Sequence, residues 1–460
     1  MKKNLIIWFL SLIIFLLVIF YPIYGYVLKS ALESGRMMGT PIGNISISIS
    51  KFPKNLYYSL KSFTSKDDRT ENSKNLKDGL SFKKKINLKN TLAFVEKIDN
   101  ETGYKYIELL DPNTKKLLHN WKLSESQINN FFKRKSFSKI KTLKGINNPS
   151  INLNDGSIVF KFEGEETKYL AKIDVKSNIE WIISDSQSDE FYLFHHSLET
   201  DADGNIYSPI IMERPHWLSE YIKSDGIFHG QKNSYADHGY VKISKDGKIL
   251  EVVSLTDILI DNGLGIFIYG VGPLETDAIH LNDVEPALFD GIAWKKNDLL
   301  MSARNLSLVF LYRPSEKKII WYKFGPWIMQ HDPDFINDKE ISIFGNDIIT
   351  YHYNRYNRFN LEKNVLINKN KKNNIWIHNF ENKKTYKLFE NAIDQSKFVT
   401  WTQGSSYYDG DNFLSNSYHN MGVTEFYYND EIVGNFVQFS DEKNIYLVSS
   451  ISFLKYEKYP

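Results

Sequence analysis

The side chains best suited to chemistry in this 460-residue chain recur at one position of a repeated pattern. Counting back eight residues from the glycine or lysine of four similar turns reaches a polar residue each time: Asn148, His196, His331 and Thr402, the last beside Gln403. His280 and Asn282 lie in a related segment, where a single strand would present both on one face. Arg304 follows an apolar run in the next segment and could reach the same place.

This set of groups suits an anion that carries several oxygen atoms. Arginine offers a bidentate fork, histidine and asparagine offer neutral donors, and a neutral imidazole can attack sulfur or phosphorus. We therefore expect transfer of a sulfuryl or phosphoryl group. A metal site is the competing interpretation, because imidazoles are common ligands. Against it, a guanidinium beside a cation is electrostatically costly, and no HExxH-like spacing occurs.

Most of the 11 histidines are expected to be structural, since a lone histidine in an apolar strand is usually a core or surface residue. The shared register sets His196, His280 and His331 apart from the rest. His238 and His419 lack this register, and we place them at most at the rim of a pocket.

Two kinds of turn alternate along the chain from residue 86 onward. The first combines Asp, Asn, Lys or Gly with a strand that ends in an apolar or aromatic residue. Its six copies begin at Asp111, Asp174, Ser244, Arg313, Asn379 and Asn429. The copies of the second begin at Asn154, Asp201, Asn337 and Asp409. Two such hairpins make one four-stranded blade, and six blades arranged radially protect one another's edges.

We therefore predict an all-β fold, a six-bladed β-propeller in which equivalent positions of the innermost strands meet in one axial pocket. Uneven spacing predicts inserted loops across 213–240 and 257–276, both over one face. Trp121, Trp181 and Trp321 end three of the copies, and we interpret them as packing residues rather than ligand platforms.

Composition argues against several classes of function. The formal net charge is +2, and Lys and Arg are scattered among nearly as many Asp and Glu, so no basic stripe for a nucleic-acid partner is visible. Cysteine is absent, which removes disulfides, thiolate nucleophiles and Cys-ligated metal sites. We expect neither a cofactor nor a bound metal.

The N-terminus predicts a membrane anchor. An apolar run from Leu5 to Phe20, continuing to Leu28, follows two lysines and is long enough to span a bilayer. Because positive charge stays in the cytoplasm, we expect a single-pass protein with its propeller on the periplasmic or extracellular side. A cleaved signal peptide is the alternative, but the run is long and no Ala-x-Ala site follows it. We assign residues 1–28 to the anchor, 29–80 to a stalk and connector, and 81–460 to the propeller.

An ordered set of motifs across roughly residues 90 to 440 resembles the bacterial aryl sulfotransferase family. The motifs are Phe194-His-His-Ser-Leu198, Asp203-Gly-Asn-Ile-Tyr207, Ile279-His-Leu-Asn-Asp-Val284, Leu300-Met-Ser-Ala-Arg-Asn-Leu-Ser307, Trp321-Tyr-Lys-Phe-Gly-Pro-Trp327 and Gln330-His-Asp-Pro-Asp-Phe335. The chain departs from better-known members in its membrane anchor, its lack of a cysteine pair, its shorter segments before the last motif, and Lys339 in place of Gly.

The resemblance implies a propeller enzyme that needs no nucleotide cofactor. It would move a sulfuryl group from a phenolic sulfate ester to a phenolic acceptor through a covalent sulfohistidine. Carried over by motif, His331 would be the nucleophile. His280, Asn282 and Arg304 would hold the sulfuryl oxygens, and His196 would assist, for example in proton transfer to the leaving phenolate. The division of acid and base roles stays open.

Two hypotheses from other classes compete with the transferase. A non-catalytic, membrane-anchored propeller would bind a sulfated or other anionic ligand or partner at the same pocket, without turnover. A quinone- or metal-dependent propeller oxidoreductase is the more distant option, because the Trp-Gly repeats and the carboxylate-rich calcium site expected of it are missing from the sequence.

Overall fold

A computed structural model divides the chain into residues 1–71 and residues 72–460, and the propeller belongs to the second unit. The predicted anchor and most of the predicted connector lie outside the described residues. Within the described part of the chain, no helix is both long enough and apolar enough to cross a membrane. The described residues are 24, 26 and 76–455, the latter apart from 102–104, 125, 129, 132–146, 153–154, 164–167, 186–190, 213–215, 223–226, 229–230, 233–234, 273, 351–364, 368–371, 441–444 and 447–449.

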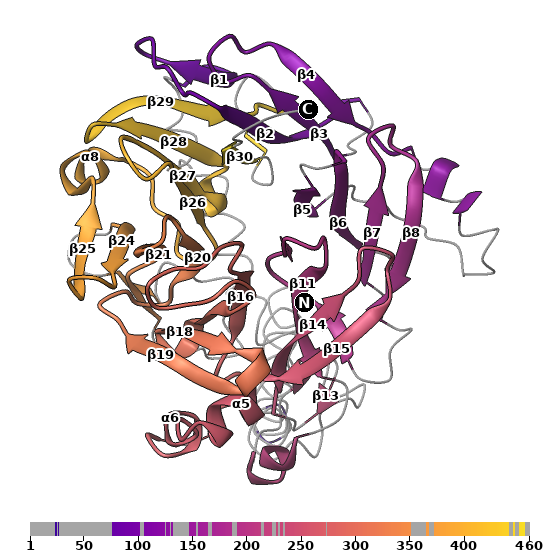
Figure 1. Cartoon of the computed structure of the whole chain (residues 1–460), viewed down its shortest axis with the longest axis vertical. Helices are drawn as coiled ribbons and strands as arrows, with labels where there is room; N and C mark the ends of the chain where they lie inside the picture. The colour runs from indigo at the N-terminus through magenta and orange to yellow at the C-terminus, as the bar shows by residue number, and fades with distance from the viewer. Residues whose placement is uncertain are drawn as a thin grey trace, which may run out of the picture. The chain divides into compact units, whose positions relative to one another are not determined.

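Six antiparallel sheets surround a common axis as the blades of a propeller (Figure 1). The innermost strands are β30 (Ser450–Lys455), β5 (Asn147–Asn152), β9 (Phe191–Phe194) with β10 (Glu199–Thr200), β16 (Leu281–Pro286), β20 (His331–Phe335) and β26 (Ser405–Tyr408). The second strands are β2 (Thr91–Ile98), β6 (Ser157–Glu163), β11 (Ile206–Met212), β17 (Leu299–Ala303), β21 (Glu340–Gly345) and β27 (Phe413–Tyr418). The prediction of a six-bladed propeller is therefore confirmed.

The two outer strands of every blade form the hairpins that the first kind of turn predicted. The third strands are β3 (Lys105–Leu110), β7 (Lys168–Ile173), β14 (His238–Ile243), β18 (Leu308–Arg313), β24 (Asn374–Asn379) and β28 (Val423–Tyr428). The outer strands are β4 (Leu117–Trp121), β8 (Ile179–Ser184), β15 (Ile249–Ser254), β19 (Lys318–Phe324), β25 (Lys384–Leu388) and β29 (Glu431–Val437).

The turn residues explain why the chain reverses at these points. In the second blade, one oxygen of the Asp174 carboxylate accepts hydrogen bonds from the backbone N–H groups of Lys176 and Asn178, at 2.8 and 2.7 Å. Ser177 between them has a φ of +64°. Side-chain acceptors and left-handed backbone of this kind are what tight turns require.

The ring closes by pairing the end of the chain with its beginning. β30 is the innermost strand of the first blade, where Phe453 lies opposite Ala93 of β2. β1 (Gly79–Phe82) adds a fifth strand beyond β29 in the last blade. Gly79 and Leu80, which the sequence analysis placed in the connector, therefore belong to the propeller sheet.

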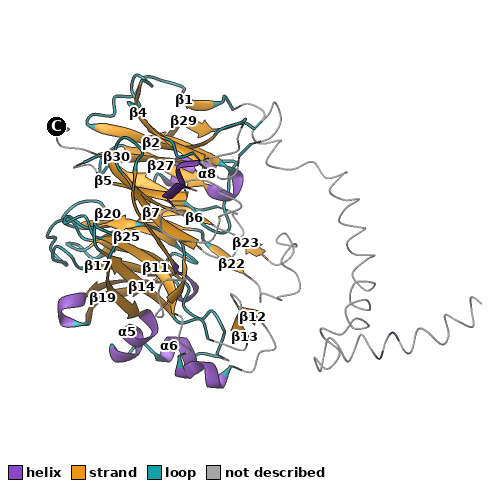
Figure 2. Cartoon of the chain, turned by 90° about the vertical axis from the view of Figure 1, so that its right-hand side faces the viewer, coloured by secondary structure: helices purple, strands orange, loops and turns teal. Residues whose placement is uncertain are grey.

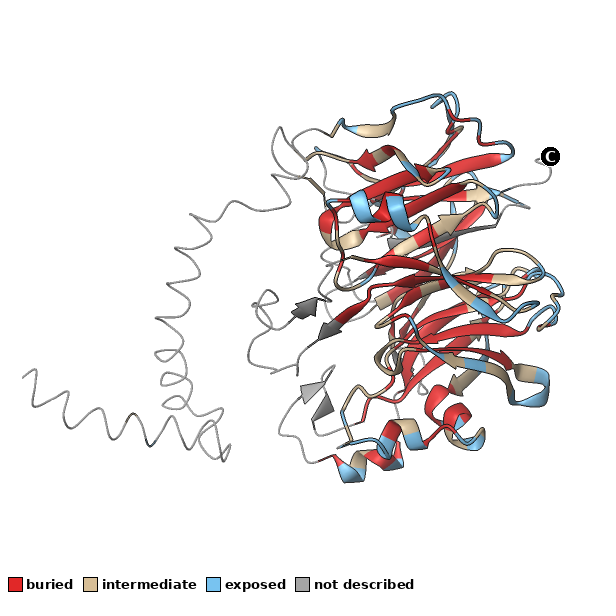
Figure 3. Ribbon diagram, turned by 90° about the vertical axis from the view of Figure 1, so that its left-hand side faces the viewer, coloured by how far each residue is buried: buried red, intermediate tan, exposed pale blue. Residues whose placement is uncertain are grey.

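Buried apolar side chains fill the spaces between neighbouring blades. In β18, Leu308 and Phe310 pack towards the third blade, whereas Val309 and Leu311 pack towards the fifth. Such strands are apolar on both faces because each sheet is covered on both sides. Figure 3 shows buried residues along the strands and exposed residues mostly in the turns and outer helices.

The tryptophans at the blade ends join each blade to the next, as expected from their position. The indole N–H of Trp121 donates to the carbonyl of Gly156 at 3.1 Å. Trp181 donates likewise to a carbonyl of the third blade at 2.9 Å. Trp321 stacks on His378 of the fifth blade with 5.0 Å between ring centroids. These side chains are therefore structural.

Segments 213–240 and 257–276 depart from the blade pattern, as the uneven spacing predicted. His216 Nε2 in the first lies 3.3 Å from Asp257 Oδ1 in the second, so the two segments pack on each other. Figure 2 shows their short elements gathered at one end of the molecule. These elements are η2 (Trp217–Tyr221), β12 (Ile227–Phe228), β13 (Gln231–Lys232), α5 (Leu255–Asp261) and α6 (Ile266–Tyr269).

The remaining short elements are β22 (Ile348–Thr350), β23 (Val365–Ile367), α8 (Glu390–Gln395), η3 (Arg304–Leu306), η4 (Pro314–Glu316) and η6 (His419–Met421).

Replacing Phe453 by alanine should lower the free energy of unfolding by about 3 to 5 kcal/mol. Its ring lies 4.9 Å from that of Phe413 and 5.5 Å from that of Phe426, so truncation leaves a cavity where the ring closes. Urea unfolding followed by tryptophan fluorescence measures the change. Ser452→Ala, on the exposed side of the same strand, is the control and should cost less than about 0.5 kcal/mol. Equal losses in the two variants would contradict this packing.

Candidate active site

Three blades bring five histidine rings together beside the propeller axis. The third blade contributes His195 and His196, between β9 and β10, together with His238 at the start of β14. The fourth contributes His280, just before β16, and the fifth contributes His331, the first residue of β20. The ring of His196 lies 5.0 Å from that of His280 and 6.1 Å from that of His331. The three histidines chosen from the sequence therefore meet.

Two of the five rings were not predicted as site residues. His195 lies 4.9 Å from the ring of His196 and 5.1 Å from that of His238. His238 is only 1% exposed, so it lies inside the cluster rather than at a rim. No repeat register marks His238, because it stands on the third strand of its blade. The adjacent pair of histidines in the sequence was the only available signal for His195.

Backbone geometry aims two of the rings. His196 and His280 both have a φ of +54°, which is uncommon for residues other than glycine. The ammonium group of Lys161 holds the first loop by donating to three successive carbonyl oxygens, those of residues 195–197, at 2.8, 2.9 and 2.8 Å. The backbone N–H of Arg304 donates to the carbonyl of His280 at 3.0 Å. Both left-handed residues are thus held by other segments of the chain, His196 by β6 and His280 by η3.

The register between blades differs from the prediction by one residue. Leu281 and His331 each form the first pair with the second strand of their blade, and a bulge follows at the next residue of both strands. Leu281 is therefore the counterpart of His331, and His280 precedes the strand. His280 and Asn282 are not alternate residues of one regular strand, because left-handed backbone and a bulge flank Leu281.

Asn346 fixes the proton on the ring of His331. The Nδ1 atom of His331 lies 2.7 Å from Asn346 Oδ1. The amide nitrogen of Asn346 donates to the carbonyls of Thr400 and Gln403, at 3.2 and 2.8 Å, and this fixes which end of the amide faces the ring. Since an amide oxygen only accepts, Nδ1 of His331 carries the hydrogen and Nε2 carries the lone pair.

Asn282 lies in contact with the chain segment that carries His331. Its Nδ2 donates to the carbonyl of Gln330 at 2.7 Å, and the residue is 3% exposed. One amide hydrogen is therefore engaged in positioning this segment. Whether the other binds a sulfuryl oxygen, as the family resemblance implies, stays a prediction.

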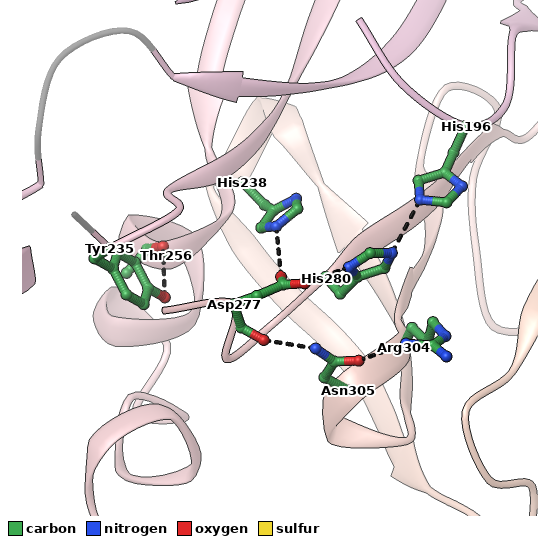
Figure 4. Close-up of polar contacts among 8 residues, drawn as sticks. All are labelled: His196, Tyr235, His238, Thr256, Asp277, His280, Arg304 and Asn305. Carbon is green, nitrogen blue, oxygen red and sulfur yellow. Dashed lines mark hydrogen bonds and ion pairs between the residues drawn. The ribbon is translucent and has the colours of Figure 1, made fainter. Parts of the chain in front are cut away.

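Arg304 places a positive charge beside the imidazoles. It begins η3, and its Nη1 donates to Asn305 Oδ1 at 2.9 Å. Asn305 in turn donates to the carbonyl oxygen of Asp277 at 2.5 Å, which fixes the amide (Figure 4). The charge of Arg304 lowers the pKa of both His331 and His280. A guanidinium so placed is suited to an anionic group on His331.

Asp277 binds two of the histidines at once (Figure 4). One carboxylate oxygen lies 2.7 Å from Nδ1 of His280, and the other lies 2.8 Å from Nε2 of His238. On its far side, Nε2 of His280 lies 3.0 Å from Nε2 of His196. Asp277 was not chosen from the sequence, although it stands three residues before His280, just ahead of the motif Ile279–Val284.

Burial and neighbouring charges keep the rings of His196, His280 and His331 neutral. Burial is the main reason that the pKa values of His196 and His331 lie well below the usual 6.5 of histidine. Burial also lowers the pKa of His280, but Asp277 opposes it there and the net lowering is smaller. Burial raises the pKa of Asp277, but His280 and His238 outweigh it and hold that pKa well below its usual range. The carboxylate is therefore ionised, and the rings of His196, His280 and His331 are uncharged.

Within the described part of the chain, Asp277 and its two histidine partners could also hold a metal ion. Ligand atoms of His238, Asp277 and His280 lie within 4.8 Å of one another. Both contacts between an imidazole and the carboxylate have the length of an ordinary hydrogen bond, so hydrogen bonds account for the geometry without a metal ion. Arg304 adds an unfavourable positive charge for a bound cation.

The remaining positions of the predicted register have supporting roles or cannot be placed. The side chain of Asn148 lies outside the described residues. The backbone N–H of Thr402 donates to Asn420 Oδ1 at 3.0 Å. Gln403 accepts a hydrogen bond from Asn346 with its carbonyl, as described above, so this blade fixes the hydrogen-bond partner of His331.

Carboxyl groups that are partly buried or, for Asp283, fully buried extend from these loops along β10, β16 and β20. Burial is the main reason that their pKa values are raised, to about 7 for Asp283 and about 8 for Asp332. Mutual repulsion adds to this effect for most of them. The five groups are Glu199, Asp283, Glu285, Asp332 and Asp334. The fold therefore favours their protonated forms.

Stability should fall as the pH rises from about 7 to about 9, with the melting temperature dropping by roughly 5 °C. The folded-state pKa values are above the ordinary 3.8 of aspartate, so folding stability is lost as the pH rises through them. In Asp332→Asn the fall in melting temperature between these pH values should be smaller than in the wild type, whereas Asp203→Asn, on an exposed turn, should leave it unchanged. Scanning calorimetry across this range checks the prediction, and an unchanged drop in Asp332→Asn would refute it.

The six-bladed propeller with an arginine beside its histidine cluster has a counterpart in one protein family. The model of the arylsulfotransferase (ASST) family matches residues 150–438, so this chain belongs to that family. The match includes every residue of the histidine cluster. No curated protein matches the chain significantly.

Solved structures resemble the chain only distantly. TolB from Acinetobacter baumannii matches with 9% identity and a TM-score of 0.38, over 79% of this chain and 66% of that one. The dihydro-heme d1 dehydrogenase NirN matches with 9% identity and a TM-score of 0.35, over 75% of this chain and 55% of that one. Kuenenia stuttgartiensis hydrazine synthase matches with 6% identity and a TM-score of 0.40, over 79% and 95%.

Proposed function

We propose that this protein is an aryl sulfotransferase that moves a sulfuryl group from a phenolic sulfate ester to a phenolic acceptor through a covalent sulfohistidine at His331. The observation that carries the proposal is the contact between His331 Nδ1 and Asn346 Oδ1. It leaves the lone pair on Nε2 of a neutral ring, which is the form of histidine that acts as a nucleophile.

In the first half-reaction, Nε2 of His331 attacks the sulfur of the donor. The N–S bond forms while the bond between sulfur and the phenolic oxygen breaks, and the electron pair leaves with the phenolate. The ring then carries an N-sulfo group on Nε2 and keeps its hydrogen on Nδ1, so it has imidazolium character. Asn346 Oδ1 accepts that hydrogen bond and stabilises the positive charge.

Arg304 supplies the electrostatic part of the proposed mechanism. The sulfuryl group carries its negative charge on oxygen throughout the transfer, and a guanidinium can donate two parallel hydrogen bonds to such oxygens. Its influence on the pKa values of His331 and His280 supports a position close to both rings. Asn282 completes the proposed cradle with its second amide hydrogen, whereas both ring nitrogens of His280 are engaged by Asp277 and His196.

The second half-reaction reverses the first with a different phenol. The acceptor oxygen attacks sulfur, the N–S bond breaks, and the electron pair returns to Nε2 of His331. The phenolic proton must pass to a base, and the neutral rings of His196 and His280 lie beside the nucleophile. The reaction balances without any further reactant.

Turnover of 4-nitrophenyl sulfate by the full chain tests the proposal. Nitrophenolate release should require phenol, and phenyl sulfate should form in equal amount. Without acceptor, we expect one equivalent of nitrophenolate and a sulfuryl group on the peptide that contains His331. Failure of several aryl sulfates to react, with a folded protein that still binds them, would instead support a non-catalytic anion-binding propeller.

We further propose that the apolar N-terminal segment anchors the protein in a membrane with the propeller on the periplasmic or extracellular side. The composition of residues 5–28 supports this, with the two lysines before it on the cytoplasmic side. Membrane fractionation of cells, followed by protease treatment of intact spheroplasts, tests the arrangement. Recovery of the propeller in the soluble fraction, or its protection from protease, would overturn it.

A further inference from the structure

We infer that Asp277 is a positioning residue that sets the proton arrangement of the His196–His280 pair and so makes this pair the base for the acceptor phenol. The inference rests on the proposed sulfuryl transfer and assigns a part of it that the family resemblance leaves open. The carboxylate of Asp277, which His238 also contacts, acts through His280 rather than on the substrate.

The carboxylate of Asp277 has both its oxygens engaged by imidazoles. His280 Nδ1 and His238 Nε2 approach different oxygens, at 2.7 and 2.8 Å. The backbone carbonyl of Asp277 also accepts from Asn305, so main chain and side chain are both held. A residue held at both carboxylate oxygens and at its backbone carbonyl cannot turn its side chain elsewhere, and its position fixes the plane of the His280 ring.

The proton arrangement follows from which atoms can donate. An ionised carboxylate only accepts, so Nδ1 of His280 carries a hydrogen and its Nε2 has the lone pair. Nε2 of His196 lies 3.0 Å from that lone pair. For both rings to be neutral, His196 must donate there. One hydrogen is therefore shared between the two Nε2 atoms.

This arrangement gives the pair the capacity for one additional proton. When the acceptor phenol attacks sulfo-His331, the pair takes the phenolic proton as the O–S bond forms and the N–S bond breaks. The positive charge is then best placed on His280, next to the Asp277 carboxylate. The direction of the pKa effect agrees, because Asp277 raises the pKa of His280 against the effect of burial. The proton returns to the next leaving phenolate.

His238 completes the arrangement from the other side of the carboxylate. It is 1% exposed, and its contact with Asp277 satisfies the oxygen that His280 does not use. A buried carboxylate with an unpaired oxygen would be costly, and its pKa would rise. His238 therefore helps to keep Asp277 ionised while His280 changes its protonation state.

Asp277→Asn should slow transfer to phenol by about 10²-fold in kcat, with little change in the KM of the donor. The amide keeps the size of the carboxylate but carries no charge and places N–H groups on one side. Without the negative charge, the pKa of His280 falls, so the acid limb of the pH–rate profile should move to lower pH while the plateau drops. A loss caused only by misfolding would lower the plateau without moving this limb.

The choice of acceptor separates this role from a structural one. An acceptor phenol acidic enough to be ionised at the assay pH needs no base, so Asp277→Asn should use it at nearly the wild-type rate. Equal losses with ionised and un-ionised acceptors would overturn the inference. Asp257→Asn is the matched control, because Asp257 also pairs with a histidine, His216, but outside the cluster, and it should change neither rate.

The tautomer of His280 can be observed without any turnover. In the full chain labelled with ¹⁵N-histidine, long-range ¹H–¹⁵N spectra should show a protonated Nδ1 and an unprotonated Nε2 for His280, assigned by loss of its signals in His280→Gln. Asp277→Asn should change this pattern. The opposite tautomer in the wild type would overturn the inference even in an active enzyme, whereas the predicted tautomer in an inactive protein would refute only the proposed function. Stoichiometric metal in the purified protein, lost in Asp277→Asn, would also overturn it.

Discussion

Replacing His331 by alanine should reduce the turnover of an aryl sulfate by at least about 10⁴-fold. The variant lacks the lone pair on Nε2 that forms the N–S bond, and no other group of the cluster is held by Asn346 in the same way. The rate should be measured with 4-nitrophenyl sulfate and phenol. In parallel, mass spectrometry of protein treated with donor alone should find the sulfuryl group in the wild type and not in the variant.

The control for this experiment is His119→Ala. His119 lies on β4, the outer strand of the first blade, where its Nε2 is 2.7 Å from the carbonyl of Val175. The same substitution there removes an imidazole that is far from the propeller axis. It should leave the rate within about twofold. Substantial turnover by His331→Ala would mean that another group attacks sulfur, and the sulfo-peptide of that variant would identify it.

The second large effect is expected at Asn346, which touches no substrate in the proposed mechanism. Asn346→Leu should lower kcat by about 10³-fold, on the scale seen when the group that fixes the tautomer of a catalytic imidazole is lost. Leucine has a similarly branched side chain but accepts no hydrogen bond. The hydrogen of His331 is then free to move to Nε2, and the imidazolium of the intermediate loses its partner.

Asn346→Asp distinguishes this explanation from simple damage to the fold. A carboxylate accepts the same hydrogen from Nδ1, so the nucleophilic tautomer is kept and part of the lost rate should return. Recovery is incomplete because the second carboxylate oxygen faces the carbonyls of Thr400 and Gln403, to which the amide donated. The negative charge should also raise the pKa of His331, which moves the acid limb of the first half-reaction to higher pH. If Asp and Leu at this position were equally slow and the pH profile did not move, Asn346 would have only a structural role.

The repeated turns made the fold predictable from the sequence. Each outer hairpin needs an acceptor side chain and left-handed backbone, so residues such as Asp174 recur at regular places whatever the rest of the blade contains. Ring closure by β30 was not predicted in detail, because the last strand carries no turn signal. The boundary of the propeller was misplaced by a few residues since β1 pairs with β29 at the far end of the chain.

Only part of the site was predictable from the sequence, because only part of it follows the repeat of the blades. His196, His280 and His331 could be chosen because they stand near the same place in successive blades. The structure shows that this register is only approximate, since bulges and left-handed residues shift it by one position. Asp277 and Asn346 act through single hydrogen bonds to ring nitrogens, and such contacts depend on the packing of whole blades. No local pattern in one sequence specifies them.

The closure of the ring has a consequence for how the protein is made. β2 is synthesised before the other five blades and its inner partner β30 after them, so the edge of β2 stays without that partner while those blades are formed. During this interval the nascent chain offers an open template for another strand. Premature termination near residue 450 would leave every residue of the histidine cluster in the product and still prevent closure. Such truncated chains would be substrates for quality-control proteases rather than partly active enzymes.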